Sequence, residues 1–224
     1  MDATSLVKRI SKRAARPLLL CGVLAPLVLG VSVIAAGLVT PDFSFLSESI
    51  SQLGARGKAH PEVMNAGLIL CGLLIAGFAY GLYWRLGRSV VAKTVWLLLA
   101  IDGIGVVLSG IFQADSKSLG LASTLEGYLH SIFAQVAFFA LLISILMFAT
   151  VVHRKPAWRG FTRMSLAVFV FNLVLLLVFL TGGAEPVDGL LVLSFFGVSL
   201  VWLEAVSLRS LWLPATAGLQ QVSP

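Results

Sequence analysis

The sequence predicts an all-α, polytopic membrane protein: one domain over residues 1–224, with six transmembrane helices in an antiparallel bundle. The composition is 58% hydrophobic with a mean hydropathy of +0.99, whereas soluble domains are roughly 45–50% apolar. Several apolar runs reach the length of about 20 residues that a helix needs to cross a bilayer. The links between them are short, which makes consecutive helices antiparallel neighbours.

The predicted spans follow the apolar runs. They cover residues 17–40, 66–86, 92–114, 128–152, 160–181 and 189–213. A basic stretch precedes the first span, so a signal peptide is the alternative interpretation of this run. Its apolar stretch of about 22 residues exceeds the 7–15 residues usual in signal peptides, which favours a membrane helix.

Lysine and arginine divide unevenly between the two sides of the predicted bundle. Of the 16 in the chain, the links after the first and third spans hold only Arg56, Lys58 and Lys117. Because cytoplasmic flanks retain positive charge, we expect a plasma (inner) membrane protein with both termini in the cytoplasm. The net charge of +6 then reflects topology, so membrane lipids are the expected partners and nucleic acid is not. The oligomeric state stays open.

The longest polar segment, residues 42–65, follows the first span on the predicted external side. Apolar residues at helical spacing predict a short amphipathic helix from Ser44 to Leu53, lying on the outer surface and ended by Gly54. These apolar residues are Phe45, Leu46, Ile50 and Leu53.

Chemistry-bearing side chains gather at the same external boundary. A carboxylate beside a histidine can act as acid and base, and a serine beside them as nucleophile. The catalytic candidates are Asp115, His130, Glu48 and Ser49. The candidates for ligand binding are Asp42, Ser44, Ser47, Ser51, Gln52, Asn65, Gln113 and Gln135. The alternative is that Asp115 and His130 only pin helix ends to the loop.

Three polar residues fall at membrane depth, where an ionisable group needs a partner or a water-filled cavity. Asp102 and Asn172 both lie near the midplane and are expected to share a hydrogen bond, with Ser109 or water as alternatives for Asp102. Glu204 is expected to pair with Arg163. No cofactor or metal is predicted, because the sequence has no HExxH, phosphate-loop, CxxC or haem motif; metal binding by the external Asp and His side chains stays open as an alternative.

At these residues a family resemblance becomes visible. LSESISQLGARG (residues 46–57), Asn65, IFQAD (residues 111–115) and His130 resemble the bacterial and archaeal membrane family known as domain of unknown function 998. That family is distantly similar to the FRAG, DRAM and Sfk membrane proteins, some of which are tied to lipid remodelling or distribution. The resemblance implies six helices and an external site, but no reaction. The proline usual at the end of the family's third helix is Gln113 here.

Three functions follow as hypotheses. The first is binding or handling of a lipid or amphiphile in an outer-leaflet pocket capped by residues 42–65. The second is an intramembrane hydrolase or acyl-transfer enzyme using Asp115, His130 and a loop serine or glutamate. The third is a small transporter using Asp102. The sequence does not decide whether the protein is an enzyme.

Overall fold

The structure is a computed structural model that describes residues 3–87, 89–116, 123–181 and 185–213. The long helices are α1 (Ala3–Leu38), α2 (Pro61–Leu86), α3 (Val90–Ile111), α4 (Leu125–Val152), α5 (Phe161–Leu180) and α6 (Asp188–Trp212). Short 3-10 helices are η1 (Ile50–Gly54), η3 (Pro156–Trp158) and η4 (Glu185–Val187). Six helices are long and apolar enough to cross a membrane, so the chain is a multi-pass membrane protein.

The predicted spans agree closely with these helices. The largest differences are at two starts, because α1 begins at Ala3 and α2 at Pro61. Proline is suited to the first helical turn, where its missing N–H has no partner to lose. Two of the charges used to predict orientation, Arg88 and Lys117, lie outside the described residues.

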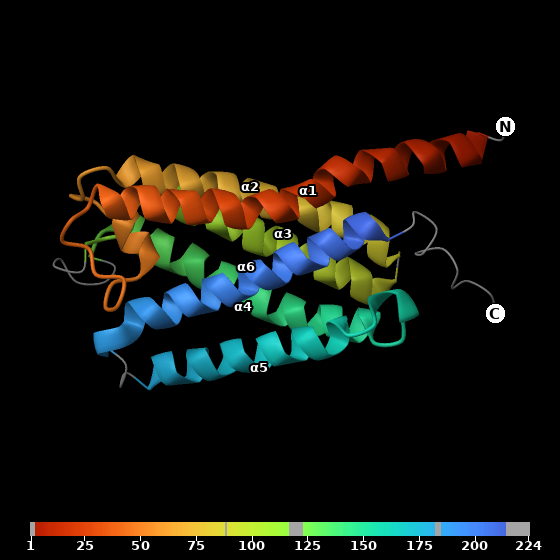
Figure 1. The fold of residues 1–224 in the computed structure, drawn as a ribbon. Coiled ribbons are helices and arrows are strands. Elements are labelled where there is room, and N and C mark those ends of the chain that lie inside the picture. Colours follow the sequence, from red (N-terminus) through yellow and green to blue (C-terminus); the bar gives the residue numbers. More distant parts are fainter. Residues whose placement is uncertain (1–2, 88, 117–122, 182–184, 214–224) are drawn as a thin grey trace.

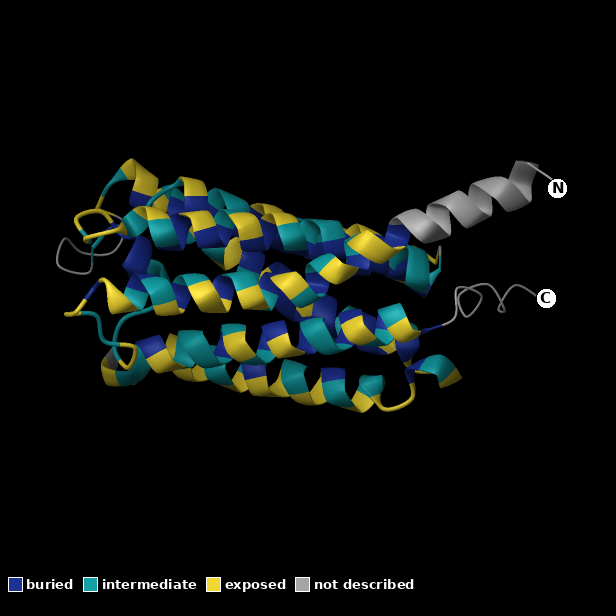
Figure 2. Cartoon of the chain, turned by 45° about the horizontal axis from the view of Figure 1, so that its top comes forward, coloured by how far each residue is buried: buried dark blue, intermediate teal, exposed yellow. Residues whose placement is uncertain are grey.

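Consecutive helices lie side by side, and α6 returns to pack against α1, so the six helices close into a ring (Figure 1). Residues 39–60 and the starts of α2, α4 and α6 share one end, which we call the loop end. The α2–α3 and α4–α5 links share the other end, which we call the basic end. Buried residues face inward and exposed residues cover the outer surface (Figure 2), which in a bilayer contacts acyl chains.

Small residues bring α2 close to both of its neighbours. A Cβ on Gly81 would lie 3.0 Å from Leu18 of α1, and Gly77 lies against Cys21. On the other side, a Cβ on Gly72 would lie only 2.4 Å from the carbonyl oxygen of Gly103 on α3. The Gly77–Gly81 pair is therefore a helix-packing motif, as GxxxG spacing indicates.

Helix α5 is attached differently, through polar contacts from a mostly exposed surface. Only Ser165 and Asn172 are buried along α5. Ser165 accepts a hydrogen bond from the Trp202 indole (2.8 Å), and the Asn172 amide donates to the Ser199 hydroxyl (2.8 Å). Two side-chain hydrogen bonds to α6 thus fix the rotation of a helix that buries little apolar area.

The segment between α1 and α2 differs from the predicted amphipathic helix. Turns occupy its first part, and the helical part is the five-residue 3-10 helix η1. Ile50 and Leu53 are buried as expected, but Phe45 and Leu46 are 39% and 52% exposed. The backbone is held by another element instead, because Leu190 N–H of α6 donates to the Leu46 carbonyl.

Candidate functional site

The loop end is built on η1, whose polar groups are bonded to neighbouring elements. The buried Gln52 side chain donates through Nε2 to the backbone carbonyl of Asp115, which follows α3 (2.9 Å). The buried Asn65 amide of α2 donates to the Gly54 carbonyl (3.0 Å). Glycine leaves room for this bond, because a Cβ at position 54 would lie 2.2 Å from Asn65 Oδ1 and would displace the amide. The Gln52-to-Gly54 string therefore ties the loop to α2 and α3.

Ion pairs extend this attachment. Arg56 donates its backbone N–H to the Ala114 carbonyl (3.1 Å), and its guanidinium pairs with Glu126 of α4. Within the loop, Lys58 pairs with Glu48 (3.1 Å). The Arg56 pair joins the loop to α4, and the Lys58 pair joins two parts of the loop. Ion pairs near a surface add little to the free energy of unfolding, so their main effect is to fix the position of the loop.

Asp115 links the end of α3 to the start of α4. Its two carboxylate oxygens accept hydrogen bonds from the Thr124 N–H (2.8 Å) and hydroxyl (2.7 Å). Thr124 in turn caps α4 by accepting from the Gly127 N–H (3.1 Å). A Cβ at Gly127 would lie 2.1 Å from the carboxylate, so a larger residue there would displace the Asp115 side chain. The Thr124 hydroxyl and then its N–H, with smaller contributions that include Arg56, lower the pKa of Asp115 below its ordinary 3.8.

His130 is buried one turn into α4 and is bonded to the backbone of α3. Its Nδ1 lies 2.7 Å from the Ser109 carbonyl oxygen and 3.0 Å from that of Phe112. Carbonyl oxygens only accept hydrogen bonds, so Nδ1 carries the hydrogen. In the neutral ring Nε2 is then the acceptor. His130 thus fastens the last turn of α3 to α4.

The four catalytic candidates do not form one bonded group in the described residues. The Asp115 carboxylate engages Thr124, His130 engages carbonyl groups, and Glu48 engages Lys58 and the Ser44 N–H. Ser49 pairs with the Ser51 hydroxyl at 3.1 Å. The bonds of Asp115 and His130 thus join the end of α3 to the start of α4.

The residues predicted to bind a ligand fall into three groups. Gln52, Asn65, Ser44, Ser47 and Ser51 take part in the loop's own interactions. Asp42 is exposed, and Gln113 is half-buried at the end of α3. Gln135 lines a hollow that lies away from the loop.

The polar residues at membrane depth correct two predicted pairings. Asp102 lies inside the bundle, at 1% exposure, but its Oδ2 has no hydrogen-bond partner among the described residues. Asn172 donates to Ser199 instead, and the Ser109 hydroxyl donates to Val106. Asp102 and Asn172 do not meet because their helices are not neighbours. Asp102 is on α3, whereas Asn172 is on α5, which packs on α4 and α6. Glu204 forms no ion pair with Arg163 in the described part of the chain.

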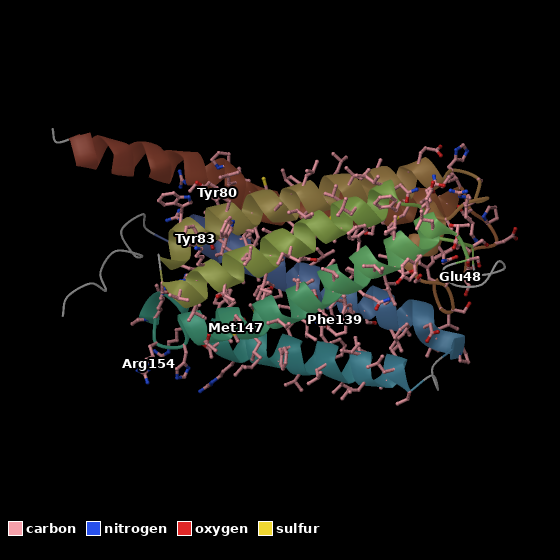
Figure 3. All side chains as sticks on the ribbon, turned by 180° about the vertical axis from the view of Figure 1, so that it is seen from behind. Glu48, Tyr80, Tyr83, Phe139, Met147 and Arg154 are labelled. Carbon is pink, nitrogen blue, oxygen red and sulfur yellow. The ribbon has the colours of Figure 1, made fainter. Side chains whose placement is uncertain are left out.

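A groove between α3 and α4 opens on the outer surface of the bundle. Phe139, one of its lining residues, is labelled in Figure 3. The volume of the groove is about 410 Å³, and it is lined by Leu98, Ile101, Ile132, Gln135, Val136, Phe139, Ala140 and Ile143. Gln135 is the one polar side chain of the eight. It is exposed, it lies about 15 Å along α4 at 1.5 Å per residue, and its amide has no hydrogen bond to any described residue.

Comparison with known families identifies the chain. A family model described as protein of unknown function (DUF998) matches residues 23–209. The chain belongs to the DUF998 family. No curated protein and no solved structure matches it. In this DUF998 protein, the residues of the LSESISQLGARG string are those that fasten the loop end to α2, α3 and α4.

Sequence reasoning included Gln135 among the ligand candidates but missed the groove around it. The signal was present: Ile132, Val136, Phe139 and Ile143 recur on one face of α4 with Gln135 among them. The sequence does not show which part of α3 lies beside this face of α4, and α3 supplies the other groove residues, Leu98 and Ile101. Among the described residues, no group of three or more histidine, cysteine or acidic side chains is arranged to hold a metal ion.

Proposed function

We propose that this DUF998 protein binds a membrane lipid or another amphiphile in the groove between α3 and α4. The observation that carries the proposal is the Gln135 amide, which lies in an apolar, membrane-facing groove with no partner in the described protein. In hydrocarbon an unsatisfied polar group costs several kcal/mol. A lipid oxygen that accepts from or donates to this amide would remove that cost.

The groove supports the same proposal by its size and lining. Its volume of about 410 Å³ is within the range of roughly 300–1,000 Å³ for small-molecule sites. From Ile132 to Ile143 it runs along about 17 Å of helix, a little over half of the roughly 30 Å hydrocarbon core. Apolar walls with one convergent polar group suit an acyl or isoprenoid chain that carries an oxygen.

The other two functions have less support. A hydrolase or acyl-transfer site needs a base in contact with its nucleophile, whereas the hydrogen bonds of His130 in the described residues go to the Ser109 and Phe112 carbonyl groups and to no hydroxyl. A transport site at Asp102 needs space beside it, whereas its neighbour Gly103 is packed against the backbone of Gly72. The loop end acts, in this proposal, as the fastening that fixes α3 against α4.

We infer the orientation from charge. The described ion pairs all lie at the loop end, whereas Arg154, Lys155, Arg159 and Arg163 have no carboxylate partner in the described residues. By the positive-inside rule, we expect the basic end and both termini to lie on the cytoplasmic side of the plasma (inner) membrane. In intact cells, an impermeant thiol reagent is expected to label a cysteine at position 58 and not one at position 155; the reverse pattern contradicts this orientation.

Photocrosslinking tests the lipid proposal. The protein is reconstituted with a phospholipid that carries a diazirine near the middle of one acyl chain, and the modified peptides are mapped. We expect labelling to concentrate on α3 and α4 residues of the groove. The exposed face of α1 serves as the control, because Leu27, Val31 and Ile34 are also exposed but line no part of the groove. Labelling that simply follows exposure, as strong on α1 as in the groove, would contradict the proposal.

A further inference from the structure

The α4–α5 link, residues 153–160, is held firmly at the basic end of the bundle. Trp158 is buried, with its ring edge-on to Phe148 and to Phe161. Arg209 of α6 donates through Nε to the Ala157 carbonyl (2.9 Å), and the Lys155 amine donates to the Leu86 carbonyl at the end of α2. The link is therefore bonded to α2 and α6 as well as to its own helices.

Two of the cations near this link serve the fold. Arg209 and Lys155 are half-buried, and their hydrogen bonds satisfy carbonyl groups at the ends of helical segments. Burial lowers the pKa of Lys155 below its ordinary value of 10.5. Arg209 and Lys155 are therefore used in hydrogen bonds within the protein, whereas the exposed arginines of this region are available to bind a ligand.

Three arginines remain on the surface of the link and of the first turn of α5. Arg154, Arg159 and Arg163 are exposed, and none has an ion pair within the described ranges. Nitrogen-tipped side chains gather around Arg154 at this end of the bundle (Figure 3). By contrast, the cations of the loop end, Arg56 and Lys58, each have a glutamate partner.

An apolar stripe continues directly from Arg163 along α5. Leu166, Val170, Val174 and Leu177 lie three, seven, eleven and fourteen residues further on, which is the spacing of one helix face. All four are exposed, by 42%, 55%, 51% and 55%. A ligand that touches both parts of this surface must carry an anionic head at the basic end and hydrocarbon along the helix.

We propose that Arg154, Arg159 and Arg163 form a binding site for the phosphodiester head of an anionic phospholipid, whose acyl chains lie on the Leu166–Leu177 face of α5. Arginine suits this role because its planar guanidinium can donate two hydrogen bonds to one phosphate. The fastened link lowers the ordering cost of binding, since it presents the arginines from a fixed backbone. The site is separate from the α3–α4 groove, and either could exist without the other.

Native mass spectrometry in detergent with added phosphatidylglycerol or phosphatidylcholine tests this site. A cation near anionic lipid favours binding by about five-fold, so Arg159→Gln/Arg163→Gln should weaken phosphatidylglycerol binding about 25-fold. Phosphatidylcholine binding should not change. The matched control is Arg16→Gln/Lys93→Gln, which removes the same charge from exposed cations of α1 and α3 and should alter binding less than two-fold.

Two results would overturn the proposal: equal losses in both double variants, which indicates diffuse charge attraction, or retention of phosphatidylglycerol by Arg159→Gln/Arg163→Gln. Glycerol 1-phosphate, the free head group, should not compete at millimolar concentration, because binding also uses the face of α5; competition would contradict that half of the proposal. All substitutions are at exposed positions, and an unchanged melting temperature without lipid verifies folding. Gln135→Leu should leave phosphatidylglycerol binding intact, which separates this site from the groove.

Discussion

The loop end and the α3–α4 groove both contain side-chain amides, but in opposite circumstances. At the loop end the amides of Gln52 and Asn65 are buried and donate to backbone carbonyls. In the groove the amide of Gln135 is exposed and has no partner in the described protein. An amide that is hydrogen-bonded within the fold contributes to stability, which is reason enough for its presence. An amide left unpaired in hydrocarbon is costly, and a ligand that bonds to it would remove that cost.

The comparison also changes the meaning of the polar loop. A segment rich in serine, acid and amide side chains resembles an active site in the sequence. In the structure its hydrogen bonds join α1, α2, α3, α4 and α6 at one end of the ring. In our proposal these hydrogen bonds give the loop its role, which is to hold the groove-forming helices in register.

The largest expected effect comes from breaking the loop end at Gly54. In Gly54→Ala the new methyl group meets the Asn65 amide, which must turn away and lose its bond to the position-54 carbonyl. We expect a loss of about 2–4 kcal/mol from overpacking and an unsatisfied buried amide, measured by thermal or denaturant unfolding in detergent. Gly30→Ala is the control, because no atom lies within 4 Å of its added Cβ. A Gly54→Ala variant as stable as Gly30→Ala would refute the fastening role.

A smaller, pH-dependent effect is expected at Asp115. Its pKa is lowered in the folded state by the bonds from Thr124, so its contribution to stability is full above the ordinary value of 3.8 and is lost as pH falls through the folded pKa. Asp115→Asn cannot ionise. The difference in melting temperature between the two proteins should therefore be largest near neutral pH and should shrink below about pH 4. A difference that stays constant from pH 7 to pH 3 would show that the charge of Asp115 contributes nothing.

The sequence was sufficient for the spans and for one packing motif. Runs of about 20 apolar residues define membrane helices because backbone groups in lipid must be satisfied within the helix. The GxxxG spacing of Gly77 and Gly81 is likewise typical of a close helix contact, and the structure places the pair against Leu18 and Cys21 of α1. Both are local properties, which a single stretch of sequence contains in full.

Predictions from the sequence were wrong for contacts that depend on which helices are neighbours in the bundle. Asp102 and Asn172 were placed at one depth, but depth along a helix does not say which helices are neighbours. The amphipathic helix failed for a related reason. Serine side chains there compete for backbone groups, as Ser44 does with the Ser47 N–H, and the Leu46 carbonyl is bonded to α6. The groove needed two helices at once, so Gln135 alone did not reveal it.

Paired substitution of the two glutamines tests the central claim most directly. Gln52→Leu and Gln135→Leu make the same chemical change in the fastened and in the unpartnered amide, and each variant is assayed for melting temperature and for photolabelling of the groove by the diazirine phospholipid. We predict that Gln52→Leu lowers stability by about 1–3 kcal/mol, because it removes the donor to the Asp115 carbonyl. At a temperature where it is folded it should retain its labelling. Gln135→Leu should be at least as stable as the wild type and lose most of its labelling. If Gln135→Leu instead lowers stability and leaves labelling unchanged, Gln135 is another structural residue and the groove is not the site of lipid binding.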